Sequence, residues 1–91
     1  MQAKVYKQKS SSMGDFYIYY NKAGKTVFSV CTADLSTPYI KNHRRFKNLK
    51  YNSETHAVVW SWQADRLLKI PLSDIKKLVP LATVLKNRVP G

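Results

Sequence analysis

Residues 15–33 read DFYIYYNKAGKTVFSVCTA, and this stretch decides the fold class. Asp15–Tyr20 and Thr26–Ala33 are both rich in aromatic and β-branched residues, which favour strands. Between them, Asn21–Lys25 is a polar connection that contains a glycine. Two strand-like runs on either side of a short glycine-containing connection predict an antiparallel β-hairpin.

The second half of the chain predicts two further strands and a helix. His56–Gln63 is apolar on both faces, which favours a central strand, and Ala64–Arg66 then turns the chain. Leu67–Leu72 predicts a further strand, in which Pro71 favours an edge position or the end of the pairing. Ser73 and Asp74 are typical N-caps followed by Ile75, Leu78 and Val79 at helical spacing, so a short C-terminal helix is expected. Residues 81–88 fit either a helix or a last short strand.

The remaining segments carry weaker patterns. Gln2–Lys9 alternates in polarity and predicts an edge strand, followed by a flexible break at Ser10–Gly14. Pro38–His43 predicts a short helical turn within a basic loop, and Phe46–Tyr51 predicts another strand.

Frequent strands and short connections predict a mainly β fold (β-rich α+β), built as a small curled antiparallel sheet. An SH3-like or OB-like barrel is one way to close such a sheet and remove its edges. The succession of strand, capped turn and apolar tail in Leu67–Leu81 resembles the end of many SH3-like barrels. That resemblance concerns the fold and implies no function.

Composition limits the class of protein and of partner. The chain has 91 residues with a formal net charge of +11, and 44% of its residues are hydrophobic. It is too apolar for a disordered basic tail, so we expect one small, basic, folded domain spanning residues 1–91. A polyanion relieves the self-repulsion of such a charge, and nucleic acid is the commonest, because binding releases counterions from its phosphates.

The main candidate interface lies between Leu35 and Ser53, where no acidic residue occurs. Arginines bind phosphates bidentately and lysines act as point charges, while neighbouring aromatic side chains contact sugars or bases. His43 is interpreted as a further phosphate or base contact. The candidate residues of this stretch are Tyr39, Lys41, His43, Arg44, Arg45, Phe46, Lys47, Lys50 and Tyr51.

Other candidates lie outside this stretch. Lys22 and Lys25 at the hairpin tip extend a phosphate-binding track if the fold turns them toward the basic loop. Trp60 is expected in the core, whereas Trp62, near a strand end, fits either the core or base stacking. Tyr17 and Tyr19 face opposite Phe16, Ile18 and Tyr20, so one of these faces is expected to be exposed. An exposed aromatic face beside lysines would favour single strands over duplex.

The sequence contains no pattern typical of catalysis, metal binding or cofactor binding. The five acidic residues are scattered singly, and neither a glycine-rich phosphate loop nor a nucleophile motif occurs. The chain holds one cysteine and two histidines, which excludes four-ligand zinc spacing. Cys31 is expected as a small buried hydrophobe in a reducing, cytoplasmic setting. We expect no signal peptide, no membrane span and no membrane partner.

The sequence therefore predicts a non-catalytic nucleic-acid-binding module, with DNA slightly favoured over RNA. Two other functions remain open. The chain could be a small regulator or inhibitor that docks on an acidic protein, since positive patches also steer protein association. It could also be a structural component of a ribonucleoprotein.

Overall fold

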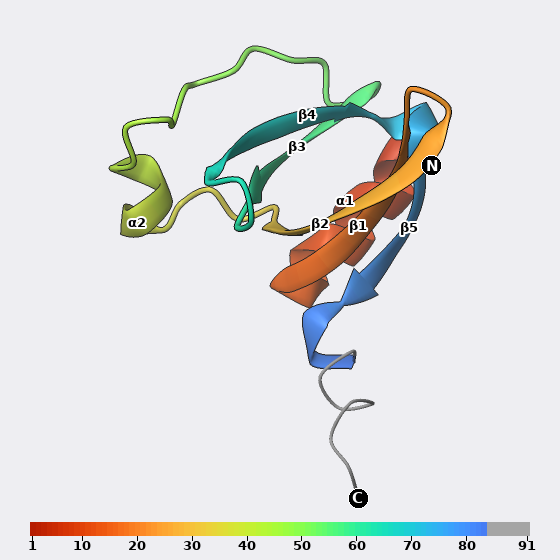
Figure 1. Ribbon diagram of the computed structural model, residues 1–91, viewed down its shortest axis with the longest axis horizontal. Coiled ribbons are helices and arrows are strands. Elements are labelled where there is room, and N and C mark those ends of the chain that lie inside the picture. The colour runs from red at the N-terminus through yellow and green to blue at the C-terminus, as the bar shows by residue number, and fades with distance from the viewer. Residues whose placement is uncertain (84–91) are drawn as a thin grey trace, which may run out of the picture.

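The hairpin predicted from residues 15–33 is confirmed and forms the centre of a five-stranded antiparallel sheet (Figure 1). The structure is a computed structural model that describes residues 1–83. In chain order its elements are α1 (Ala3–Met13), β1 (Asp15–Lys22), β2 (Lys25–Thr32), α2 (Pro38–Lys41), β3 (His56–Ser61), β4 (Arg66–Pro71), the 3-10 turn η1 (Leu72–Asp74) and β5 (Ile75–Pro80).

The hairpin turn is tighter than the sequence indicated, because only Ala23 and Gly24 connect β1 to β2. Both residues have positive φ, 52° for Ala23 and 81° for Gly24. Positive φ at both central positions is typical of a type I′ turn, whose twist matches that of the strands. Ala23 carries a Cβ in a region that L-residues other than Asn and Asp rarely adopt.

Replacing Ala23 by Asn is expected to stabilise the protein. Asn tolerates positive φ and precedes Gly in the preferred type I′ sequence, so we expect a gain of about 0.5–1 kcal/mol. Thermal unfolding followed by circular dichroism should show Tm rising by about 2–8 °C. Thr26→Asn is the matched control in the neighbouring strand, where Asn is disfavoured, and it should not raise Tm. Equal Tm changes in the two variants would contradict this account.

The strand order β4-β3-β2-β1-β5 confirms that β3 is an interior strand and that β4, which carries Pro71, is an edge strand. Pairing between β2 and β3 is limited to Cys31 with Ser61 and Thr32 with Trp60. The β3–β4 hairpin therefore diverges from the rest of the sheet (Figure 1). The fold is mainly β, as predicted. Its sheet is open, so barrel closure does not occur within residues 1–83.

The predicted helix after Ser73 is wrong, because this segment forms η1 followed by β5, which pairs with β1. Ile75 and Leu78 are both buried although they lie three residues apart. The register of β5 against β1 shifts between them, leaving Lys76 as an extra residue in a β-bulge. The bulge brings both apolar side chains to the core face. Two buried residues three positions apart are otherwise typical of a helix, which is why the sequence pattern resembles one.

The predicted N-terminal edge strand is also wrong. Residues 3–13 form α1, which includes most of the segment expected to be a flexible break, and Gly14 with φ 66° ends the helix. Ala3, Tyr6 and Ser10 are buried at the i, i+3, i+7 spacing of one helical face. This face covers the core side of the sheet, and a strand could not present all three side chains to it.

In the middle of the chain, α2 confirms the predicted helical turn. The strand predicted at Phe46–Tyr51 is wrong, because these residues have no regular secondary structure. Its last five residues, from Lys47 to Tyr51, are all exposed, so the segment has no buried face that would hold it in the sheet. Residues 81–83 are helical, and the rest of the prediction for residues 81–88 lies outside the described residues.

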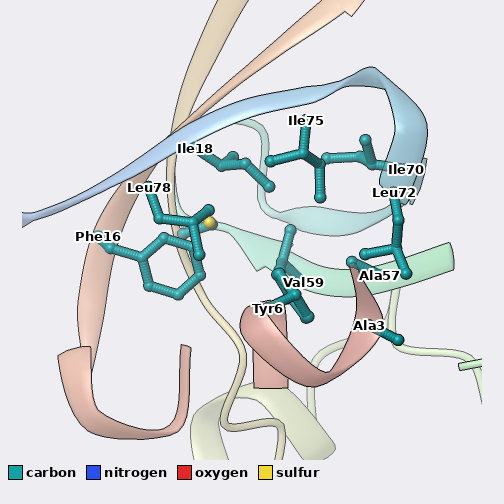
Figure 2. Close-up of a cluster of buried hydrophobic side chains, with 11 residues drawn as sticks. Ala3, Tyr6, Phe16, Ile18, Ala57, Val59, Ile70, Leu72, Ile75 and Leu78 are labelled. Atoms are coloured by element: carbon teal, nitrogen blue, oxygen red, sulfur yellow. The ribbon is translucent and has the colours of Figure 1, made fainter. Parts of the chain in front are cut away.

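The main core lies between α1 and the sheet. Figure 2 shows Phe16, Ile18 and Val59 from the strands and Tyr6 from α1 pointing toward one another. Cys31 belongs to this cluster and is fully buried, as predicted, and burial raises the pKa of its thiol to about 12. Cys31 is therefore a neutral packing residue at physiological pH.

Candidate nucleic-acid interface

The sheet register separates the core face from a second face, called here the outer face. Directly paired residues of neighbouring strands lie on the same face. Thr32 pairs with both Asp15 and Trp60, and none of the three belongs to the main core cluster. By alternation, Tyr17 and Tyr19 of β1 lie on this outer face, opposite the buried Phe16 and Ile18. Both tyrosines are half-buried, so the aromatic face of β1 that was expected to be exposed is only partly exposed.

Three aromatic rings form a platform on the outer face. Tyr19 is directly opposite Phe28 of β2, and Tyr17, two residues before Tyr19 on β1, is the diagonal neighbour of Phe28. The ring centroids are 5.7 Å apart for Tyr19–Phe28, 5.8 Å for Tyr17–Phe28 and 6.4 Å for Tyr17–Tyr19. Phe28 is 54% exposed. We call Tyr17, Tyr19 and Phe28 the aromatic platform.

A lysine from the neighbouring strand adds positive charge to the platform. Lys77 of β5 is paired with Tyr19, and its Nζ lies 4.7 Å from the centroid of the Tyr19 ring. This distance places the ammonium group over the ring in a cation–π contact. Lys77 is exposed, so its charge also remains available to an anion that reaches the platform.

A second group of aromatic side chains continues the outer face beyond β2. Trp62 follows β3, and its ring centroid is 5.9 Å from that of Tyr39. Tyr39 is 5.8 Å from His43, which meets Trp60 edge-on at 4.9 Å. Trp60 is fully buried, as expected, whereas Trp62 is half-buried at the surface. These contacts fix α2 and the start of the basic loop against the end of β3.

Hydrogen bonds hold this second group in place. Trp62 Nε1 donates to Asp15 Oδ1 over 2.9 Å, and the Trp62 backbone N–H donates to the Val30 carbonyl over 2.9 Å. Asp34, where the chain leaves β2, accepts hydrogen bonds from the Ser36 hydroxyl and backbone N–H. These bonds lower the pKa of the Asp34 carboxyl and stabilise the bend that leads into α2.

Four cationic side chains gather next to these rings and form a shallow pocket. Arg45 Nη1 donates to the Ala64 carbonyl over 3.1 Å, which ties the basic loop to the turn before β4. Among the described residues, no carboxylate lines the pocket. We call it the basic pocket, and its lining residues are Arg44, Arg45, Lys47, Leu49, Arg66 and Leu67. One carboxylate stands nearby, because Asp65 precedes Arg66 and accepts a hydrogen bond from the Tyr39 hydroxyl. The four cations outnumber it and attract an anion, and the arginines can bind a phosphate bidentately.

The structure brings some of the predicted site residues together and separates others. Around the basic pocket and its aromatic neighbours lie Tyr39, His43, Arg44, Arg45, Lys47 and Trp62. Phe46 follows Arg45 and is half-buried, and Lys41 is exposed at the end of α2.

The hairpin tip is not brought to the basic pocket. Lys22 lines a different pocket together with Pro71, the last residue of β4, and it is paired with Lys25. Arg45, in contrast, contacts the turn before the first residue of β4. Lys50 and Tyr51 are exposed just before Ser53 and Glu54, both of which contact Lys7 of α1. These four predicted residues therefore lie outside the interface defined by the basic pocket and the platform.

Sequence reasoning did not include Phe28, Lys77 and Arg66 among the candidates. The alternation of Tyr17 and Tyr19 did indicate an exposed aromatic face. Pairing of Phe28 with Tyr19 depends on a two-residue turn, whereas the sequence suggested a longer connection. The bulge that made β5 resemble a helix also concealed the position of Lys77.

Within residues 1–83, no three His, Cys, Asp or Glu side chains are grouped to hold a metal ion. The described part of the chain also contains no helix that is long and apolar enough to cross a membrane. Comparisons with family models, with curated proteins and with solved structures found no match.

Proposed function

We propose that this chain is a non-catalytic nucleic-acid-binding module. The observation that carries the proposal is the basic pocket, in which Arg44, Arg45, Lys47 and Arg66 converge and whose lining, within residues 1–83, contains no carboxylate. Phosphates of the nucleic-acid backbone are the anions that suit such a cluster, and the two leucines of the pocket offer an apolar floor to a sugar or base. The single cysteine, buried as a free thiol, fits a reducing, cytoplasmic setting as part of this proposal.

The physical basis of the binding is electrostatic. A net charge of +11 on 91 residues attracts any polyanion at long range, and the basic pocket gives that attraction a defined place. Each phosphate that a cation neutralises releases condensed counterions, so affinity falls as salt is added. Four contacts with a single strand would give a slope of log K against log salt of about −3.

Fluorescence anisotropy with labelled single-stranded DNA, duplex DNA and RNA tests the proposal. We expect micromolar or tighter binding at about 0.1 M salt to at least one of these ligands, with the steep salt slope given above. Absence of binding to all three would contradict the proposal. Capture of an acidic protein under the same conditions would then favour the regulator interpretation.

A further inference from the structure

We infer that the aromatic platform is a base-stacking site, so that the preferred ligand is a single strand. This inference rests on the proposed function and identifies the form of nucleic acid that the interface takes. Tyr17, Tyr19 and Phe28 stand on the sheet face opposite the core face that α1 covers. Such surfaces bind unpaired bases, since every base has a π-face, whereas the bases of a duplex already stack on one another.

Phe28 is the primary stacking ring of the platform. It is 54% exposed, whereas Tyr17 and Tyr19 are half-buried beside it. Lys77 already lies over the Tyr19 ring, 4.7 Å from its centroid. A base placed on Phe28 would therefore have a cation close by, and its phosphate could contact the Lys77 ammonium group.

The platform is linked to the rest of the interface along the same face. Val30, two residues after Phe28 and paired with Tyr17, accepts the hydrogen bond from the Trp62 backbone. Trp62 then contacts Tyr39, at the beginning of the basic loop. A single strand can thus stack on Phe28 and cross β2 at Trp62. From there it reaches the basic pocket without passing to the core face.

Charge favours nucleic acid over an apolar protein segment as the occupant of the platform. An apolar protein segment would satisfy the rings, but it would gain nothing from Lys77 or from the four cations of the basic pocket. A single strand carries both complementary parts, a base for each ring and a phosphate for each cation. The platform and the pocket are therefore two parts of one binding track.

The test compares Phe28→Leu with Phe28→Tyr in the full chain. Leu keeps apolar bulk without an aromatic ring, and Tyr keeps the ring. For an oligothymidine of about 12 nucleotides, Phe28→Leu should lower affinity roughly 5- to 150-fold, as expected for one lost stacking contact. Affinity for duplex DNA should change by less than about twofold. Phe28→Tyr should bind as the unmodified protein does. The salt slope should stay the same in both variants, because neither loses a phosphate contact.

A 2-aminopurine in the strand gives a second readout, because its emission is quenched when it stacks on an aromatic ring. Unmodified protein and Phe28→Tyr should quench it, and Phe28→Leu should not. If the protein binds single strands with a steep salt slope but Phe28→Leu changes neither affinity nor quenching, the stacking site is wrong and the proposed function stands. If the protein binds no nucleic acid, both fail.

Discussion

Replacing Arg44 and Arg45 together by Gln is expected to lower the affinity for a single strand about 25-fold at 0.1 M salt. Both side chains line the basic pocket, and Gln keeps a polar side chain while removing the charge. Each lost contact reduces the salt slope by about 0.7, so the double variant should show a slope that is shallower by about 1.4. The loss should be similar for all base sequences, because phosphate contacts carry no sequence information. Anisotropy titrations at several salt concentrations measure both quantities.

The matched control removes the same charge from the opposite side of the molecule. Lys4 and Lys9 are exposed on α1, which covers the core face of the sheet. The double variant Lys4→Gln, Lys9→Gln lowers the net charge by the same amount as the Arg44, Arg45 variant. Any loss of affinity in it therefore measures only the general electrostatic attraction. We expect this control to keep most of the affinity and of the slope. If both double variants lose affinity equally, binding depends on net charge and the basic pocket is not the site.

Trp60→Ala is expected to lower the free energy of unfolding by about 3–5 kcal/mol, the range for a buried aromatic residue. Trp60 is fully buried beneath the basic loop, where its ring meets His43 at 4.9 Å. Tm should fall by at least about 12 °C in a protein of this size. Thermal and urea unfolding followed by circular dichroism measure the change.

Trp60→Phe separates the role of the ring from that of the indole nitrogen. Trp60 Nε1 is buried with no hydrogen-bond partner among the described residues, so removing it relieves a desolvation cost of about 1–3 kcal/mol. The smaller ring leaves a cavity that opposes this gain. We expect a net loss below about 1.5 kcal/mol, less than half the loss in Trp60→Ala. Equal losses in the two variants would show that the ring does not support the loop through His43.

Local patterns sufficed to predict the elements whose partners are close in sequence. The β1–β2 and β3–β4 hairpins are pairs of neighbouring apolar runs joined by short turns. The first was predicted as a hairpin, and the second as two strands joined by a turn. Pro71 correctly indicated an edge strand, because it lacks the N–H needed for a second partner. β5 was missed because its pairing with β1 is non-local. Its bulge also places Ile75 and Leu78 on one face at a helical spacing.

α1 was missed because its buried face is short and only partly apolar, with Ala3, Tyr6 and Ser10 as its members. The sheet that covers this face forms from residues later in the chain, so alternation within the segment was the stronger local signal. Packing against the sheet, rather than the local sequence pattern, therefore stabilises this segment as a helix.

The part of the candidate site that lies in the basic loop was predictable from amino-acid composition. The part that depends on strand pairing and on contacts between distant segments was not. A loop with five cations and no acid stands out in the sequence, and Arg44, Arg45 and Lys47 do meet in one pocket. Arg66 joins them only through the contact of the loop with the turn before β4. Likewise, Phe28 and Lys77 reach Tyr19 only through strand pairing.

An NMR titration of the isotopically labelled protein with single-stranded DNA locates the binding surface residue by residue. We expect the signals of Phe28, Tyr17, Trp62 and the Arg44–Lys47 segment to shift together as the strand is added. Signals on the exposed side of α1 should stay in place. Shifts concentrated on α1, with the aromatic platform and the basic pocket unchanged, would contradict the assignment of the outer face as the nucleic-acid interface.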